Sequence, residues 1–194
     1  MTVALRPLRP GDVPALVDVF VQAFRHGYPE VLPADVLDTV TPGTVSGWFA
    51  HWTATLNTTV AEVDGVPVGF VRYGDQRQGR DQGPGRDQSP GEGPGEGQRE
   101  GHGEGEEPEP PVGYVAALYV HPDASGAGIG RLLLDHAMDS LTESGRVAVT
   151  LWVFRANERA RGLYRRAGFV PDGTEMVDPQ WRVPQIRMRR PLPR

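Results

Sequence analysis

Cysteine and lysine are both absent from this chain of 194 residues, so that its 20 lysine-plus-arginine positions are all arginine. The absence of cysteine excludes disulfides, thiolate zinc sites and a cysteine nucleophile, and it is typical of a reducing compartment. Alanine, glycine, proline, valine and arginine are plentiful, a bias typical of a GC-rich genome. We therefore attach no chemistry to the missing lysine.

Long apolar runs are missing as well. No stretch approaches the roughly 20 apolar residues that a membrane-spanning helix needs. The first residues, MTVALRPLRPGDVPAL, lack the apolar core of a signal peptide. The sequence therefore predicts a soluble, cytoplasmic protein without a membrane partner.

The net charge of −5 is unevenly distributed along the chain. Residues 74–111 contain ten acidic residues and four arginines, whereas the rest of the chain contains 15 acidic residues and 16 arginines. The body of the protein is thus close to neutral and has no basic stripe of the kind that binds nucleic acid. We expect no nucleic-acid partner.

The acidic segment 74–111 contains no Ala, Val, Ile, Leu, Met, Phe, Trp or Tyr. Because it cannot bury apolar surface, nothing offsets the entropy lost on ordering it. We predict a disordered Gly/Pro/acidic insertion in one domain spanning residues 1–194. The segment follows TTVAEVDGVPVGFVRYG, which predicts a hairpin with an Asp64-Gly65 turn, and precedes the expected strand VGYVAALYV. The segment therefore joins two strands of one sheet. Three roles are open for it: a solvated tether, a region that attracts cationic amines, or a scaffold that recruits a partner.

Apolar periodicity predicts the remaining elements. Strands are expected at 3–8, 146–153, 169–170 and 185–190, and helices at 10–25, 33–56, 130–141 and 157–167. Asp12 is a plausible cap of the first helix, a break is expected near Thr41-Pro42-Gly43, and Gly168 should end the last helix. This order predicts an α/β protein with a mixed sheet and helices on both faces.

A glycine loop, SGAGIGRLLLDH, links the strand 112–120 to the next helix. Free backbone N–H groups and the helix dipole make such a junction an anion site. Gly126, Gly128 and Gly130 are spaced two apart, so the dinucleotide pattern G-x-G-x-x-G is not met, and no Lys-Ser/Thr follows as in a P-loop. The loop therefore suits a pyrophosphate, but it matches neither the dinucleotide-binding pattern nor the P-loop. The alternative is that the glycines only shape a tight connection between the strand and the helix.

Two motifs carry a family resemblance. LYVHPDASGAGIGRLLL resembles the acyl-CoA-binding signature of the GNAT superfamily of N-acetyltransferases, whose loop reads Arg/Gln-x-x-Gly-x-Gly/Ala. WVFRANERARGLYRRAGF resembles the family's later motif, Asn-x-x-Ala-x-x-Leu-Tyr-x-x-x-Gly-Phe, at every named position. The match is sharp over 112–170 and diffuse elsewhere. It implies the GNAT fold, a mostly antiparallel sheet in which parallel strands 4 and 5 splay apart, with helices on both faces.

The resemblance also implies a site for acetyl-CoA as co-substrate, without a metal. The backbone of Leu118, Tyr119 and Val120 would bind the pantetheine arm, and one N–H there would polarise the thioester carbonyl. The pyrophosphate would lie against Gly126, Ala127, Gly128, Ile129, Gly130 and Arg131. Asn157 would bind the pantetheine, and Tyr164, two helical turns later, would assist the departing thiolate.

The implied reaction is direct attack of an amine on acetyl-CoA, with a small-molecule amine or a protein N-terminus as acceptor and a homodimer as in many family members. Two departures stand out. Ser125 occupies the place of the usual Arg or Gln at the head of the loop, and Tyr114 occupies the place of a frequent glutamate base. The base is thus unassigned, which keeps open a non-catalytic acyl-CoA sensor.

Several side chains have simpler explanations beside the functional ones. Tyr164 could only pack in the core, and Asn157 could only cap its helix. His121, Glu62 and Glu175 are candidate bases that are more typical of the surface. A further group, expected at the acceptor side or in the core, comprises His26, Tyr28, Trp48, His51 and Trp52, whereas His136 is expected to be surface or core filler.

Overall fold

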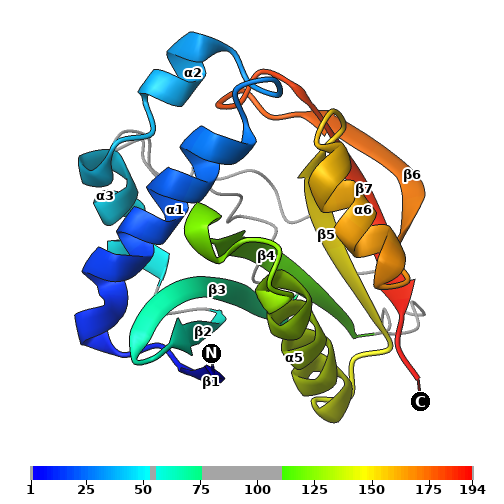
Figure 1. Ribbon diagram of the computed structural model, residues 1–194. Helices are drawn as coiled ribbons and strands as arrows, with labels where there is room; N and C mark the ends of the chain where they lie inside the picture. The colour runs from blue at the N-terminus through cyan, green and yellow to red at the C-terminus, as the bar shows by residue number, and fades with distance from the viewer. Residues whose placement is uncertain (1, 53–55, 76–110, 194) are drawn as a thin grey trace, which may run out of the picture.

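The structure, a computed structural model, describes residues 2–52, 56–75 and 111–193, with the backbone alone for residues 50–52. Its centre is a seven-stranded sheet in the order β1-β2-β3-β4-β5-β7-β6 (Figure 1). The strands are β1 (Val3–Pro7), β2 (Asn57–Val63), β3 (Val66–Asp75), β4 (Val112–Val120), β5 (Ala148–Phe154), β6 (Val170–Val177) and β7 (Pro184–Pro191). All neighbours pair antiparallel except β4 and β5, which are parallel, so the predicted fold class is confirmed.

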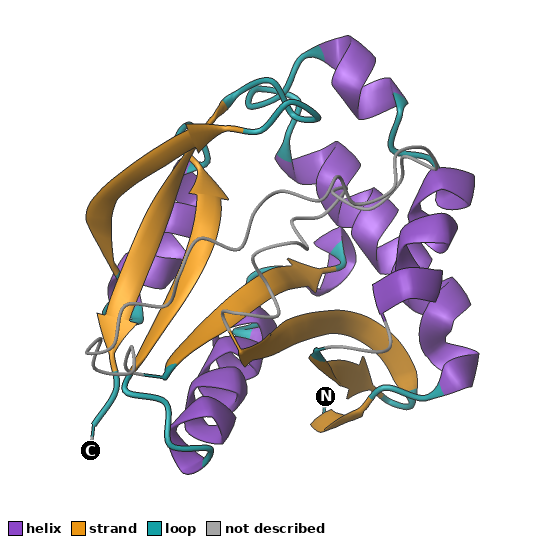
Figure 2. Ribbon diagram, turned by 180° about the vertical axis from the view of Figure 1, so that it is seen from behind, coloured by secondary structure: helices purple, strands orange, loops and turns teal. Residues whose placement is uncertain are grey.

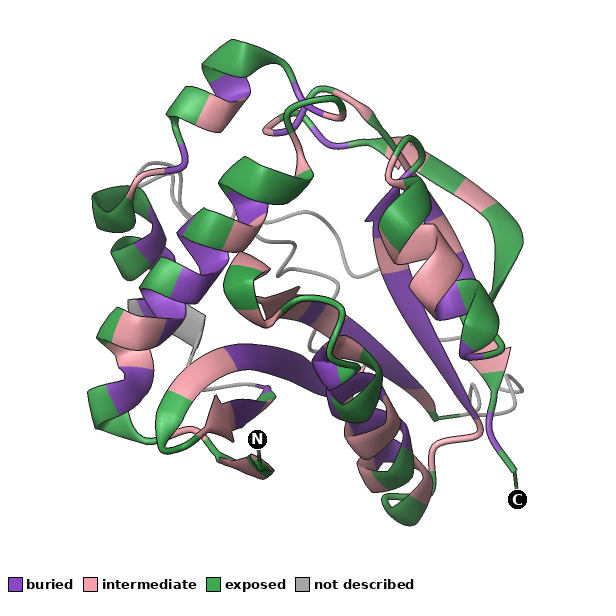
Figure 3. Ribbon diagram, in the orientation of Figure 1, coloured by how far each residue is buried: buried purple, intermediate pink, exposed green. Residues whose placement is uncertain are grey.

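Helices cover both faces of the sheet. They are α1 (Val13–Gly27), α2 (Ala34–Asp38), α3 (Pro42–Trp52), α5 (Ile129–Glu143) and α6 (Glu158–Arg166), with 3-10 turns η1 (Pro10–Asp12) and η2 (Pro122–Ala124). Side chains that alternate along β3 enter two separate cores: Phe70 packs with α1–α3, and Val71 packs with α5 and α6. Exposed residues lie on the outward faces of the helices (Figure 3). None of the helices in these ranges is long and apolar enough to cross a membrane.

The parallel strands β4 and β5 separate after a short shared stretch. Their pairing runs from Val112 with Ala148 to Val115 with Leu151 and then ends, although β4 continues to Val120 (Figure 2). Beyond that point β4 pairs with β3 and β5 pairs with β7. The β3–β4 register shifts between Arg72 and Tyr73, which leaves Ala116 as an extra residue in β4. A bulge bends its strand, so its position where the β5 pairing ends accounts for the splay.

The hairpin of β2 and β3 has the predicted turn. Asp64 and Gly65 both have positive φ, at 50° and 80°, as a two-residue hairpin turn of the type I′ class requires. β3 extends to Asp75, so the first two residues of the predicted insertion, Gly74 and Asp75, belong to the sheet and pair with β4. Residues 76–110, on which the prediction of disorder falls, lie outside the described residues. They connect the paired ends of two neighbouring strands.

The predicted break in the helix 33–56 is present, whereas the last hairpin and the cap of α1 differ from the prediction. The predicted helix 33–56 is two helices, α2 and α3, separated at residues 39–41 as the Thr-Pro-Gly signal indicated. The last hairpin is larger than predicted, because β6 has eight residues rather than two. Its sequence, VPDGTEMV, is mostly exposed at the sheet edge, and its apolar residues do not alternate with polar ones along the strand, so no period-2 signal marks it.

Asp12 is not the side-chain cap of α1. Its carboxylate accepts hydrogen bonds from Arg6 Nη1 at 2.7 Å, from Arg6 Nη2 at 2.8 Å and from the Arg9 backbone N–H at 2.7 Å. Arg6 Nε donates to Glu62 at 2.6 Å. We call Arg6, Asp12 and Glu62 the β1 corner. A charged donor binds a carboxylate more strongly than helix N–H groups do, so the Asp12 side chain pairs with Arg6 and does not cap α1.

Candidate active site

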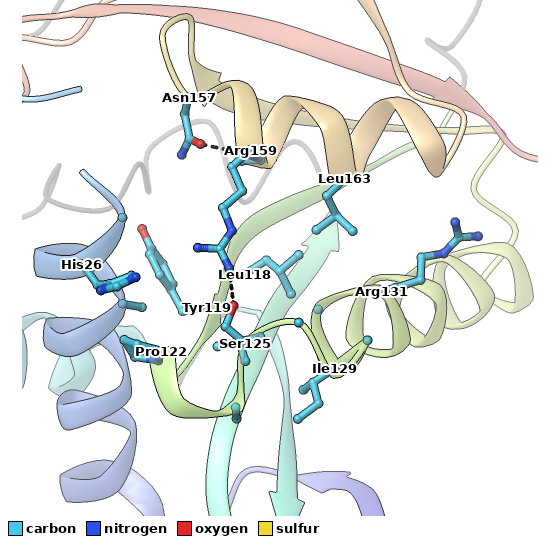
Figure 4. A pocket seen from close by; sticks show the side chains of 18 of the residues that line it. His26, Leu118, Tyr119, Pro122, Ser125, Ile129, Arg131, Asn157, Arg159 and Leu163 are labelled. Carbon is cyan, nitrogen blue, oxygen red and sulfur yellow. Dashed lines mark hydrogen bonds between the residues drawn. The ribbon is translucent and has the colours of Figure 1, made fainter. Parts of the chain in front are cut away.

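A cavity of about 400 Å³ opens along the free half of β4. We call it the β4 cavity. Its walls come from the end of α1, from residues 118–120 of β4, from η2 and the glycine loop, from the beginning of α5 and from the length of α6 (Figure 4). The structure gathers here every predicted site residue except Ala127, namely Leu118, Tyr119, Val120, Gly126, Gly128, Ile129, Gly130, Arg131, Asn157 and Tyr164. Ala127 is in the same loop but does not line the cavity.

The backbone of β4 borders the cavity where its pairing with β5 has ended. Beyond Val115 the β5 side of β4 makes no ladder with another strand within residues 2–52, 56–75 and 111–193. Backbone N–H and C=O groups at such an edge are ready to pair with an extended ligand. Leu118 and Val120 pack toward α5 and α6, whereas the Tyr119 ring lies 4.4 Å, centroid to centroid, from Phe20 of α1.

The glycine loop presents the N-terminus of α5. Gly126 and Gly128 have φ of 85° and 80°, where an L side chain is strained although nothing would clash with it. Gly128 is the N-cap residue of α5 and supplies no capping side chain. The first N–H groups of this 15-residue helix and its positive dipole end are therefore available to an anion. Gly130 lacks this constraint, because an added Cβ would make ordinary contacts of 3.7 Å with Leu163 and Val120.

Asn157 and Tyr164 lie on α6 as the spacing predicted. The Asn157 Oδ1 accepts a hydrogen bond from the Ala160 backbone N–H at 3.0 Å, so the residue caps α6. Capping does not use the amide nitrogen of Asn157, and this nitrogen donates to Tyr28 in the hydrogen bond that lowers the Tyr28 pKa. The Tyr164 side chain is 8% exposed and also packs 6.0 Å from the Phe169 ring, centroid to centroid. Tyr164 therefore both packs in the core and lines the cavity.

Four tyrosines come together around the splay. Burial raises the pKa of Tyr164, and Tyr28 and Tyr114 raise it further. Burial also raises the pKa of Tyr119 well above its usual value. Burial likewise raises the pKa of Tyr28, an effect that hydrogen bonds with Tyr119 and Asn157 partly offset. These phenols stay protonated near neutral pH, so they can donate hydrogen bonds but cannot serve as bases.

The position of the family's frequent glutamate does not hold a base either. Burial raises the pKa of Tyr114 to about 12. Next to it, burial lowers the pKa of Arg72 on β3 to about 10, although the Tyr114 side chain opposes the shift, and Arg72 is 2% exposed. Within the described residues no aspartate or glutamate lines the β4 cavity. Its wall is cationic, with Arg131, Arg159 and Arg166.

The candidate bases from the sequence lie elsewhere. Glu62 belongs to the β1 corner, and Glu175 on β6 is paired with Arg155. His121 follows β4, with its Nε2 3.9 Å from Asp18, and its Nδ1 accepts a hydrogen bond from the Asp123 N–H at 3.3 Å. These three side chains do not line the cavity.

The remaining candidates divide between cavity and core. His26 and Tyr28 line the β4 cavity. Trp48 is buried in the α1–α3 core, and His136 on α5 faces the Tyr73 ring across 6.2 Å. The side chains of His51 and Trp52 lie outside the described residues.

Sequence reasoning missed two charged residues of the cavity wall, Arg159 and Arg166. The available signal was their place on the motif helix, two and nine residues after Asn157. Arg159 donates a hydrogen bond to the Ser125 Oγ across the cavity (Figure 4). Exposed arginines on a helix are usually solvated, so their residue type alone did not mark them.

Comparison with known proteins identifies the family. The model of the acetyltransferase (GNAT) family matches residues 14–169. A mycothiol acetyltransferase of Beutenbergia cavernae is 44% identical over 64 residues, which are 33% of this chain and 22% of that protein. The peptidyl-lysine N-acetyltransferase YjaB of Escherichia coli is 35% identical over 79 residues, 37% of this chain and 50% of that protein. The chain thus spans between about a fifth and a half of these curated relatives.

Solved structures show the same fold. A GCN5-related N-acetyltransferase from Rhodopseudomonas palustris superposes with a TM-score of 0.69 at 20% identity, covering 99% of this chain and 97% of that one. The PaiA N-acetyltransferase of Thermoplasma acidophilum, solved in complex with coenzyme A, gives 0.66 at 15% identity, covering 98% and 99%.

Proposed function

Because the chain belongs to the acetyltransferase (GNAT) family, we propose that it transfers an acetyl group from acetyl-CoA to an amine. One observation carries the proposal: a single cavity contains the free backbone edge of β4, the uncapped N-terminus of α5 and the buried Tyr164 phenol. These three features match the extended pantetheine arm, the diphosphate and the thioester of this donor, in that order.

The pantetheine arm would extend along Leu118–Val120, where its amides complete the hydrogen bonds that β5 does not supply. A β4 N–H beside the thioester carbonyl would stabilise the oxyanion, an effect of about 3–4 kcal/mol in a dry site. The diphosphate would lie on the N–H groups of Gly126–Arg131. Asn157 would support the pantetheine arm through its amide nitrogen, which would exchange the hydrogen bond with Tyr28 for one with the arm.

In the reaction the amine nitrogen forms a bond to the thioester carbon, and the carbon–sulfur bond then breaks. The amine loses its proton to water, and the thiolate leaves carrying the negative charge. A free thiol has a pKa of about 8.5, so a phenol whose pKa burial has raised holds its proton more tightly than the thiol does. Tyr164 therefore acts chiefly as a hydrogen-bond donor to the leaving sulfur.

The acceptor in this proposal is a small-molecule amine or a protein N-terminus. By name, the relatives include mycothiol acetyltransferases and a peptidyl-lysine N-acetyltransferase, so one name points to a small molecule and the other to a lysine of a protein. Water accepts the proton of the amine, because no carboxylate is among the described residues that line the cavity.

We place the protein in the cytoplasm as a single domain. A homodimer fits the edge strand β6, whose Val170 and Val177 are 60% and 59% exposed. Light scattering of the purified protein measures the mass that decides this point.

The test of the proposal is thiol release from acetyl-CoA with a panel of amines, with mass spectrometry of each product. Release with one class of amine is the expected result. The second candidate is a non-catalytic acyl-CoA sensor, which the carboxylate-free wall also favours. A sensor would raise the melting temperature in acetyl-CoA yet leave the thioester intact with every amine.

A further inference from the structure

The two walls of the β4 cavity meet at a hydrogen bond between Arg159 and Ser125. Arg159 projects from the first turn of α6, and Ser125 is the first residue of the glycine loop, 34 positions earlier. The guanidinium donates to the Ser125 hydroxyl, and both residues line the cavity (Figure 4). A neutral hydroxyl does not neutralise the charge of its partner, so this contact leaves a net positive charge above the loop.

The neighbouring arginines are differently engaged. Arg131 Nε donates to both carboxylate oxygens of Asp135 at 2.8 Å, and its Nη1 donates to the Arg166 carbonyl at 3.1 Å. Arg161 and Arg165 both pair with Glu158. Arg159 has no carboxylate within ion-pair distance in the part of the chain that the structure describes. It is thus a cation at the loop whose charge is open to a ligand.

Residues 125–130 of the loop supply neutral donors only. Their N–H groups and the α5 dipole favour an anion, but Ser125 adds a short side chain without charge. A planar guanidinium binds two phosphate oxygens at once, more strongly than a neutral donor does. Arg159 is exposed and bonded to a hydroxyl, so turning from Ser125 to a phosphate has little cost.

We propose that Arg159 is the phosphate-binding cation of this site and that it contacts the diphosphate of acetyl-CoA from α6, above the glycine loop. The inference rests on the proposed function, because it takes acetyl-CoA as the ligand. The loop and α6 would then bind the donor from two sides, with Ser125 holding the guanidinium in place before the donor arrives.

The experiment measures binding by titration calorimetry, together with KM and kcat. Three ligands are compared: acetyl-CoA, acetyl-dephospho-CoA, which keeps the diphosphate but lacks the 3′-phosphate, and acetyl-pantetheine, which has neither. Arg159→Ala should weaken binding of the first two about tenfold or more, the effect of losing a charge-assisted hydrogen bond. Binding of acetyl-pantetheine and the value of kcat should be unchanged.

Arg165→Ala is the matched control, because Arg165 is on the same helix, equally charged, paired with Glu158 and outside the cavity wall. It should bind all three ligands as the wild type does. Adding Ser125→Arg to Arg159→Ala should restore most of the lost affinity, because the cation then comes from the loop.

Three results would overturn the assignment to the diphosphate. Arg159→Ala could bind acetyl-CoA as tightly as the wild type does. It could lose affinity for acetyl-pantetheine to the same degree, which indicates a structural role. It could lose affinity for acetyl-CoA alone, which moves the contact to the 3′-phosphate. A wild-type protein that binds none of the three ligands would instead refute the proposed function itself, and this inference with it.

Discussion

The β1 corner and the β4 cavity each contain an arginine held by a side chain distant in sequence, yet the two arginines have different partners. Arg6 binds two carboxylates, Asp12 and Glu62, and its side chain is 13% exposed. Arg159 binds a hydroxyl at the rim of a cavity and is exposed. Carboxylates raise the pKa of Arg6 and complete its coordination, so it has no capacity left for a ligand. An arginine with a neutral partner can still bind an anionic ligand. This difference distinguishes an arginine that stabilises the fold from one that is available to a ligand.

Arg6→Ala should have the largest effect on stability. It leaves the Asp12 carboxylate buried without its cation, and breaking such a pair costs about 3 kcal/mol. Urea denaturation should show this loss, whereas Arg159→Ala, on the surface, should change the free energy of unfolding by less than about 0.5 kcal/mol. An equal loss of unfolding free energy in the two variants would contradict the distinction between the arginine of the β1 corner and the arginine of the β4 cavity.

In contrast to Arg6→Ala, Tyr164→Phe should lower the rate of the reaction rather than the stability of the fold. Removing a hydrogen bond to a charged sulfur should cost about 1.5–3 kcal/mol in the transition state, so kcat should fall about tenfold to a hundredfold. Binding of acetyl-CoA should change little. Tyr73→Phe is the matched control, since Tyr73 is also buried but its hydroxyl donates to Ser140 at 3.2 Å, away from the cavity. Equal losses in kcat and in acetyl-CoA affinity would exclude the role at the leaving group.

Within the cavity, Gly128→Ala and Gly130→Ala should separate a conformational need for glycine from a spatial one. Alanine at Gly128 must adopt φ near 80°, at a cost of about 1–2 kcal/mol. Gly130 is helical and has room for a methyl group, so alanine there should stabilise α5 by up to about 1 kcal/mol. Thermal unfolding of the two variants should therefore shift in opposite directions. A loss of stability at Gly130 would show that its neighbours cannot accommodate a Cβ.

Much of the fold and of the cavity follows from the sequence, because local signals specify them. Apolar periodicity indicated the buried strands and the helices, and Asp64-Gly65 indicated the hairpin turn. The exposed edge strand β6 was underestimated because polar residues carry no such period. The motifs located the residues of the β4 cavity, since the glycine loop and α6 have nearly fixed spacing in the family.

Side-chain pairs that join different structural elements were not predictable. Asp12 has the residue type and place of a helix cap, and only the position of β1 beside η1 makes it the partner of Arg6. Arg159 resembles any exposed helix arginine until α6 is packed across from Ser125. In both cases residue type sets what a side chain can bind, whereas the tertiary structure sets which partner is within reach.

Acid should weaken the β1 corner, and this is the smallest of the expected effects. Hydrogen bonds from Arg6 hold the pKa of Asp12 below its usual value, despite the opposing effect of burial. The stabilisation is therefore complete above the unfolded-state pKa of about 3.9 and is lost as the pH falls through the lower pKa of the folded state. The free energy of unfolding, measured by urea titration between pH 2 and 6, should decline in this range.

Asp12→Asn isolates that contribution, because the amide keeps the shape of the side chain but cannot ionise. The variant should be less stable than the wild type at pH 6, and the two stability curves should converge as the pH falls through the folded-state pKa of Asp12 and its carboxyl group becomes neutral. Parallel curves would mean that the carboxylate of Asp12 does not carry the acid dependence. Arg159→Ala should follow the wild-type curve throughout, because its partner, the Ser125 hydroxyl, does not titrate in this range.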